Sequence, residues 1–255
     1  MKRTLFVIAF IITAAAMMGQ TPETMALADS SGNHGILISE EQTESISTRD
    51  SLTTESNKTW DYKVLKYIQE HRTPFGNRVW IAVSNSFVAA PLPAAGYAVA
   101  ALFTDDQQNK DLLLNNAGEM ALSEVVNLGL TMGIKSIVQR PRPWVAYEGD
   151  LVCLQKVRST SFPSGHTSMA FATATSLSLV CPKWYVIAPA FLWAGAVGYS
   201  RMYIGAHYPS DVLAGALIGT GAAVLVHLVQ SQLWQQNNSE IPAKKAVVIP
   251  FAISF

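Results

Sequence analysis

The chain has 255 residues, a length that suits one domain with extensions at its ends. Its 18 Lys and Arg residues balance 18 Asp and Glu residues, so there is no overall field that would recruit nucleic acid or an anionic membrane surface. Only 14% of the residues are charged, against about 25% in typical soluble domains, whereas the hydrophobic content of 49% lies in the ordinary soluble range. The composition therefore leans toward a membrane protein but does not by itself establish one.

The N-terminal part has the features of an export signal followed by an arm. A basic start at residues 2–3 precedes an apolar run at 5–18 and a small-x-small site at 26–28. Because the run of 14 apolar residues is short for a span of about 20, we predict a cleaved signal peptide over 1–28, with an uncleaved anchor as the alternative. Residues 29–58 are rich in Ser, Thr, Glu, Asp and Gly, which predicts a disordered arm.

Apolar periodicity predicts an all-α bundle of about six helices over residues 59–231. The first helix is short and amphipathic and would lie on the core or on the membrane surface. The segments expected to be helical are 60–72, 78–103 (kinked at Pro91 and Pro93), 110–139, 163–180, 184–203 and 208–230. The last of these is rich in Gly and Ala, which suits close helix packing. A C-terminal tail at 232–255 has no assigned role.

We expect the bundle to lie in a membrane. Segments 184–200 and 212–228 are nearly uncharged, whereas Asn and Glu residues interrupt the helix at 110–139. Charges in a span are costly and usually face the bundle interior. The polar residues of this helix that share one face are Asn116, Glu119, Ser123 and Asn127. An inward polar stripe would reconcile the helix with lipid, and a soluble periplasmic bundle is the alternative.

Cys153 and Cys181 are the two cysteines of the chain. A helix between them would be about 25 Å long, at about 1.5 Å per residue. A disulfide needs Cα atoms within about 7 Å. We therefore predict two free thiols.

Three short segments carry reactive side chains: KSIVQRPRP at 135–143, PSGH at 163–166 and SRMYIGAHYPSD at 200–211. The first ends a predicted helix, the second begins one, and the third joins the end of one helix to the start of the next. Because the helices alternate in direction, all three segments are expected at the same end of the bundle.

The cations of these segments suit a phosphate group. Lys135 and Arg142 lie two helical turns apart, and prolines on both sides of Arg142 end the helix there, so Arg142 can bend toward Lys135. Arg offers a two-pronged contact to phosphate oxygens and Lys a compact charge. Arg201 adds a third cation. A basic helix end at a membrane surface is the alternative, but it explains only the first segment.

The second segment opens a helix, where free backbone N–H groups and the helix dipole favour an anion. Ser164 can donate its hydroxyl, and Gly165 lets the backbone approach phosphate closely. His166 is placed to protonate a departing alkoxide. An ordinary helix cap would explain the serine but not the histidine.

His207 and Asp211 are four residues apart, where side chains on a helix meet. An Asp that accepts from one imidazole nitrogen leaves the other nitrogen free to attack phosphorus. The alternative for Asp211 is a helix cap. Near the first segment, Arg140 fits a surface or headgroup contact. Trp144 and Tyr147 fit interface anchors, or an acyl-chain entrance.

Together the segments resemble the signature of the type 2 phosphatidic acid phosphatase superfamily, which is K-x6-RP, PSGH and SR-x5-H-x3-D. That superfamily includes lipid phosphate phosphatases, class A acid phosphatases and vanadium haloperoxidases. The fixed positions are filled by Lys135, Arg142, Pro143, Pro163, Ser164, Gly165, His166, Ser200, Arg201, His207 and Asp211. The residues around the second and third motifs are more similar to those of the membrane lipid phosphatases than to those of the soluble acid phosphatases.

The resemblance implies a role for each residue. His207 would be the nucleophile that forms a phosphohistidine, Asp211 would orient it, and His166 would act as acid and then as base. The residues that would hold the phosphate are Lys135, Arg142, Ser164, Gly165 and Arg201. The acidic residues near the motifs are too few to hold Mg²⁺, so no metal and no cofactor are expected.

We therefore predict a metal-independent phosphatase that acts on the phosphate monoester or pyrophosphate of a membrane lipid. The export signal places the motif end on the periplasmic side of a bacterial inner membrane. Candidate substrates by resemblance are phosphatidic acid, phosphatidylglycerol phosphate, isoprenyl pyrophosphate and lipid A, and the sequence does not choose among them. The alternatives are a soluble periplasmic acid phosphatase, a vanadate-binding oxidase and a non-catalytic scaffold. No nucleic-acid partner is expected, and the oligomeric state is open.

Overall fold

The computed structural model describes residues 59–237, with side chains described to residue 232. The predicted signal peptide and arm lie outside the described residues, as does residue 238 onward of the predicted tail. The described elements, in chain order, are α3 (Trp60–Glu70), α4 (Pro74–Asn85), the 3-10 helix η1 (Ser86–Ala89), α5 (Leu92–Ala100), α6 (Gln107–Val138), α7 (Pro143–Ala146), α8 (Gly165–Val180), α9 (Trp184–Tyr203) and α10 (Pro209–Asn237). The predicted all-α bundle is confirmed.

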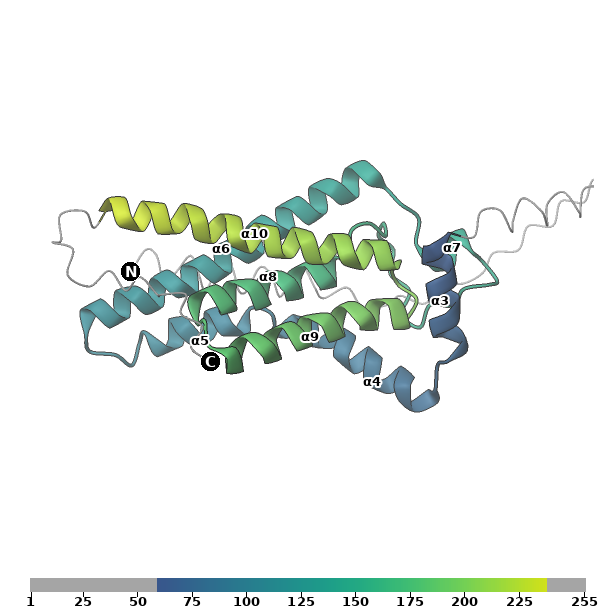
Figure 1. Ribbon diagram of the computed structural model, residues 1–255, viewed down its shortest axis with the longest axis horizontal. Helices are drawn as coiled ribbons and strands as arrows, with labels where there is room; N and C mark the ends of the chain where they lie inside the picture. The colour runs from purple at the N-terminus through teal and green to yellow at the C-terminus, as the bar shows by residue number, and fades with distance from the viewer. Residues whose placement is uncertain (1–58, 238–255) are drawn as a thin grey trace, which may run out of the picture.

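α8 lies at the centre of the bundle, in contact with α6, α9 and α10. These helices run lengthwise side by side, whereas α3 and α7 lie across one end of the bundle (Figure 1). The small side chains of α8 are buried over most of its length, from Thr167 to Ser176. Small residues let neighbouring helix backbones approach closely.

Glycines of α10 set the distance between α10 and α8. A Cβ atom on Gly215 would lie 2.6 Å from the carbonyl oxygen of Ser164, and one on Gly219 would lie 2.0 Å from that of Ser168. No side chain fits at these distances. The close packing predicted from the Gly and Ala content of this segment is confirmed.

Two of the described helical regions are long and apolar enough to cross a membrane: Gln107–Ala146, which contains α6, and Pro209–Gln232 of α10. The pair Pro74–Ala89 and Leu92–Ala100 adds a third if it forms one span, bent by 40°. This bend is the kink predicted from Pro91 and Pro93. α9 is not among these regions, although segment 184–200 is nearly uncharged.

The polar stripe of α6 faces the inside of the bundle. Glu119, Ser123 and Asn127 are buried, and Asn116 is half-buried. Glu119 Oε1 lies 2.8 Å from Nδ1 of His227 on α10. Ser123 Oγ donates to the carbonyl of Glu119 at 2.9 Å, whereas Oδ1 of Asn127 has no hydrogen-bond partner among the described residues. The stripe is thus turned away from lipid, where exposed polar groups would be costly. Within the described residues, both cysteines are free, as predicted.

Candidate active site

The first motif lies where α6 ends. α6 stops at Val138, and Gln139 adopts the left-handed conformation (φ 46°) with its N–H bonded to the carbonyl of Lys135. Arg142 then precedes α7, whose first residue is Pro143. Lys135 Nζ donates to the carbonyl of Thr160 at 2.8 Å, which ties the helix end to the loop before the second motif.

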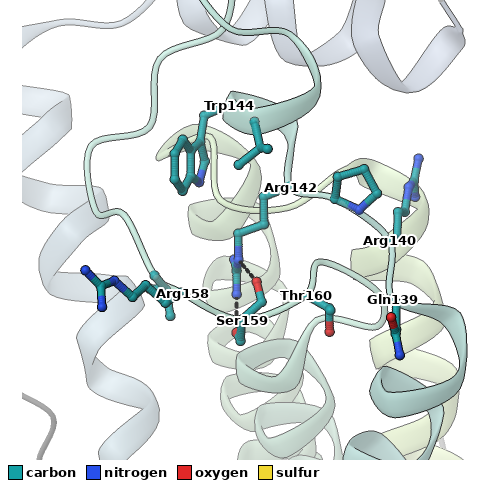
Figure 2. Close-up of a pocket in the computed structure, with 10 residues that line it drawn as sticks. Gln139, Arg140, Arg142, Trp144, Arg158, Ser159 and Thr160 are labelled. Carbon is teal, nitrogen blue, oxygen red and sulfur yellow. Dashed lines mark hydrogen bonds between the residues drawn. The ribbon is translucent and has the colours of Figure 1, made fainter. Parts of the chain in front are cut away.

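Arg142 is buried, with 5% of its surface exposed. Figure 2 shows its guanidinium reaching Ser159: Nε donates to the carbonyl at 2.6 Å and one terminal nitrogen donates to Oγ at 2.8 Å. The other terminal nitrogen donates to the carbonyl of Ala206 at 2.8 Å and lies 3.3 Å from Nε2 of His207. All these partners are neutral, so none of them offsets the positive charge of Arg142.

Arg201, at the end of α9, is 2% exposed. One terminal nitrogen donates to Oγ of Ser84 on α4, whereas its Nε has no hydrogen-bond partner among the described residues. A buried charged donor without a partner is costly. An anion beside Arg201 would satisfy it.

The second motif begins α8, with Ser164 as the residue before the first turn. Its N–H donates to the backbone carbonyl of Asp211 at 3.0 Å, so the second and third motifs are joined directly. Its Oγ lies 2.9 Å from Oγ1 of Thr167. A Cβ on Gly165 would meet only Thr131, at 3.8 Å. The backbone of α8 at Gly165 is therefore not crowded by side chains of the described residues.

His166 lies in the first turn of α8 and is half-buried. Its ring lies on the ring of Phe87 from η1, with a centroid distance of 3.8 Å. This contact was not predictable from the sequence, because nothing marks Phe87 apart from the other aromatic residues of its segment. The contact holds the His166 ring against η1.

The third motif places His207 and Asp211 deep in the protein, 2% and 0% exposed. His207 Nδ1 lies 3.5 Å from Asp211 Oδ2, and its Nε2 faces Arg142. Because a guanidinium only donates, the contact with Arg142 requires Nε2 to be the accepting nitrogen. The proton of the neutral ring is then on Nδ1, on the side of Asp211. Ser161 Oγ and the N–H of Tyr208 also donate to Asp211 Oδ2.

Both imidazoles experience the charges of the surrounding cations. Burial lowers the pKa of His207 well below its usual value, and the charges of Arg142, Arg201 and Lys135 lower it further. Burial likewise lowers the pKa of His166, followed by the charges of Arg201, His207, Arg142 and Lys135. The three motifs are thus brought together at one end of the bundle, where burial and nearby cations favour the neutral form of both histidines.

Arg140, expected to be a surface or headgroup contact, is 29% exposed and also has partners inside the protein. One of its terminal nitrogens donates to Asp211 Oδ1 at 2.7 Å, and the other donates to Oδ2 of Asp61 on α3 at 2.8 Å. Its guanidinium also lies over the ring of Tyr208, 3.8 Å from the centroid. Asp61 and Ser161 were missed as well, because no spacing in the sequence connects residues of α3 and the loop to Asp211.

The two aromatic residues after the first motif lie near the site. Trp144 and Arg158 line a cavity of about 280 Å³ beside Arg142 (Figure 2). The ring of Tyr147 packs against that of Tyr62, with a centroid distance of 4.8 Å. Among residues 59–237, no three His, Cys, Asp or Glu side chains gather so that they could hold a metal ion.

Comparison with known proteins agrees with this geometry. A family model described as PAP2 superfamily matches residues 115–235. A lipid A 1-phosphatase of Rhizobium johnstonii is 30% identical over 172 residues, which cover 65% of this chain and 68% of that protein. The chain belongs to the PAP2 superfamily. The matched region of this PAP2 protein contains all three motifs.

Two further similarities extend the comparison. The PAP2 protein is similar to an undecaprenyl-diphosphatase of Sulfolobus acidocaldarius, with 32% identity over 112 residues. These residues cover 44% of this chain and 54% of that protein. The chain thus matches about half the length of that relative. It superposes on the crystal structure of a transmembrane PAP2 type phosphatidylglycerolphosphate phosphatase from Bacillus subtilis with a TM-score of 0.56. The two chains are 21% identical, and the superposition covers 91% of this chain and 98% of that chain. At this identity the likeness shows the fold alone.

Proposed function

We propose that this PAP2 protein is a phosphatase that removes phosphate from a membrane lipid through a phosphohistidine intermediate, without a metal ion. The observation that carries the proposal is the setting of His207. Its Nδ1, which has no hydrogen-bond partner among the described residues, lies 3.5 Å from Oδ2 of Asp211, and its Nε2 faces the buried cation Arg142. This arrangement prepares Nε2 to attack a phosphorus atom held by the cations.

Binding of the phosphate would use charges that the protein leaves unmatched. Arg142 has neutral partners, and Arg201 has a buried nitrogen without one. Lys135 and the first N–H groups of α8 would complete the set of donors. Three cations and a helix N-terminus supply the charge that a metal ion supplies in other phosphatases. Arg142 would exchange its weak contact with His207 for a phosphate oxygen.

The first chemical step would form a bond from His207 Nε2 to phosphorus while the bond from phosphorus to the lipid oxygen breaks. Asp211 would stabilise the positive charge that develops on the ring. His166 would give a proton to the departing oxygen. Binding of a phosphate dianion offsets the cations that lower the pKa of His166, so the bound substrate itself favours the protonated ring that this step requires.

The second step would return the enzyme to its starting state. His166, now neutral, would take a proton from a water molecule as its oxygen attacks phosphorus. The bond between phosphorus and His207 Nε2 then breaks, and inorganic phosphate leaves. The two proton transfers of His166 cancel over the cycle, so it consumes one water molecule and needs no other reactant.

The class of substrate is proposed from the relatives and from the helices. The relatives are named for lipid A and undecaprenyl diphosphate, which share a phosphate carried by a membrane lipid. α6 and α10 are suited to span a membrane, and the motifs lie at one end of them. We propose a site at the periplasmic face of a bacterial inner membrane, an orientation that depends on the export signal predicted at 1–28.

The test is a phosphate-release screen on the full-length protein in detergent micelles. The panel contains phosphatidic acid, phosphatidylglycerol phosphate, an isoprenyl pyrophosphate and lipid A, with p-nitrophenyl phosphate as the soluble comparison. His207→Ala is the control and should abolish both turnover and any acid-labile phosphoenzyme. Retained activity in this variant would refute the assignment of the nucleophile, and equal turnover of the soluble phosphate would refute the lipid preference.

A further inference from the structure

We propose that Asp61 and Arg140 are positioning residues that hold the carboxylate of Asp211 in its working orientation toward His207. The inference rests on the function proposed above. It makes α3, which precedes every motif, a part of the active site. Neither Asp61 nor Arg140 occupies a fixed position of the three motifs.

Asp211 has two oxygens with different tasks. Oδ2 faces His207 and accepts hydrogen bonds from Ser161 and the N–H of Tyr208. Oδ1 accepts from Arg140 at 2.7 Å. Because the carboxylate is fully buried, its rotation is set by these protein donors and not by water. The bond to Arg140 fixes Oδ1 and thereby aims Oδ2 at the ring.

Arg140 is itself held on several sides. It lies between the left-handed Gln139 and Pro141, just past the end of α6. Its guanidinium donates to Asp61 at 2.8 Å and lies over the ring of Tyr208. A guanidinium is a planar fork, so it can bridge two carboxylates in a fixed geometry where a lysine could not.

Asp61 lies in the first turn of α3 and is 5% exposed. Its Oδ1 accepts from the N–H of Ser210 at 3.0 Å, and its Oδ2 accepts from Ser210 Oγ at 2.6 Å. Ser210 is in the first turn of α10, directly before Asp211. One carboxylate of α3 therefore holds both the start of α10 and the guanidinium that binds Asp211.

The arrangement also divides charge. Arg140 lies between two carboxylates, so its single positive charge is shared by Asp61 and Asp211. Asp211 thus keeps negative charge with which to stabilise the ring of His207 when it attacks. Without the charge of Asp61, Arg140 would pair with Asp211 alone and neutralise it more fully. A misoriented or more fully neutralised Asp211 carboxylate would slow the attack of His207 on phosphorus. Every group that holds the phosphate would still be present.

A purely structural role for Asp61 is the alternative, since α3 is attached to the protein by other contacts too. Lys66 Nζ pairs with Asp150 Oδ1, and the side chain of Gln69 donates to the carbonyl of Asp150 at 3.0 Å. These contacts fix the same helix but do not touch Arg140. Lys66→Met is therefore a matched control: it removes an ion pair of α3 and leaves Asp211 undisturbed.

The experiment measures kcat and KM of the full-length protein in micelles for Asp61→Asn and Lys66→Met. The substrate is phosphatidic acid, unless another of the four lipids in the screen is turned over faster, in which case that lipid is used. We expect Asp61→Asn to lower kcat about tenfold, equivalent to about 1.4 kcal/mol of transition-state stabilisation. KM should stay within about a factor of two, because the phosphate-holding groups remain. Lys66→Met should keep the wild-type kcat.

A double-variant cycle separates positioning from loss of structure. Arg140→Lys keeps the charge but loses the fork, and serves as a second route if Asp61→Asn does not fold. If Asp61 acts through Arg140, Asp61→Asn combined with Arg140→Lys should lose no more activity than the poorer single variant. Melting temperatures recorded on the same samples show whether each variant is folded.

Three results would overturn the proposal. They are equal kcat values for Asp61→Asn and Lys66→Met, losses that multiply in the double variant, or a wild-type kcat for Arg140→Lys. If the wild-type protein released phosphate from none of the four lipids, the proposed function would fail and this inference with it. This inference alone would be overturned if the wild-type protein released phosphate, His207→Ala abolished that activity, and Asp61→Asn kept the wild-type kcat.

Discussion

Replacing Gly215 by Ala tests whether the packing of α10 on α8 sets the geometry of the active site. A Cβ at this position would lie 2.6 Å from the carbonyl oxygen of Ser164, whereas ordinary contacts begin at 3.4 Å, so the helices must separate by about 0.8 Å. Overpacking of this kind costs about 1–3 kcal/mol. Ser164 belongs to the second motif, and α10 begins with the third, so the displacement falls between two groups that must act together.

A misplacement of about 1 Å can reduce the rate of an enzyme about 100-fold. We therefore expect Gly215→Ala to lower both the melting temperature and kcat by clear amounts. Gly221→Ala on the same helix is the control, since a Cβ there would meet nothing within 4 Å. Alanine is favoured over glycine in a helix by up to about 1 kcal/mol, so this control should not lose stability.

The assay is lipid phosphate release at saturating substrate, together with thermal unfolding in the same detergent. The reasoning would be refuted if Gly215→Ala melted and turned over substrate like the wild-type protein. It would also be refuted if Gly221→Ala were equally impaired, because the loss would then not come from contact with Ser164. Either result would mean that the distance between α8 and α10 does not control the site.

Three further predictions concern the chemistry. Asp211→Asn should lower kcat by orders of magnitude with little change in KM, because the amide no longer stabilises the charged ring of His207; steady-state kinetics would contradict this role if kcat stayed near normal. Activity should survive dialysis against EDTA, since the proposed mechanism uses three cations in place of a metal, and a complete loss that Mg²⁺ restores would contradict that mechanism. Burial and neighbouring cations lower the pKa of His207, so the ring stays neutral as the pH falls through 6.5. The acidic limb of the kcat/KM profile should therefore lie below pH 6.5, after allowance for substrate ionisation. A limb at or above that pH would show that these charges do not act on His207.

Local features of the sequence were sufficient for most of the fold. The helix end before Arg142 and the bend near Pro91 were predictable because proline acts on its own segment, and the structure has both. The inward stripe that contains Glu119 followed from 3–4 residue spacing. The meeting of the three motifs followed from the number of helices between them. The catalytic roles assigned to the motif residues remain predictions for the kinetic tests above.

Which helices are long and apolar enough to cross a membrane was less predictable from the sequence. Segment 184–200 is nearly uncharged, yet α9 is not among the regions suited to cross a membrane, whereas α6 is, although it carries Glu119 and Glu124. Length and mean hydropathy decide this property, and a few buried polar groups change it little when the bundle interior accepts them. Which face of α6 lies inside depends on α8 and α10, and that is a property of the packed bundle.

The sequence by itself determined the helices, their breaks and the inventory of reactive groups, because each depends on residues close together in the chain. Only the tertiary structure decided that Arg140 lies between Asp61 and Asp211, with Asp61 79 residues before Arg140. Arginine beside a helix end looks the same in sequence whether it faces water or a buried carboxylate. The choice is made by the crossing of α3 over the end of the bundle, which brings Asp61 to Arg140 and holds the two charges in a fixed position.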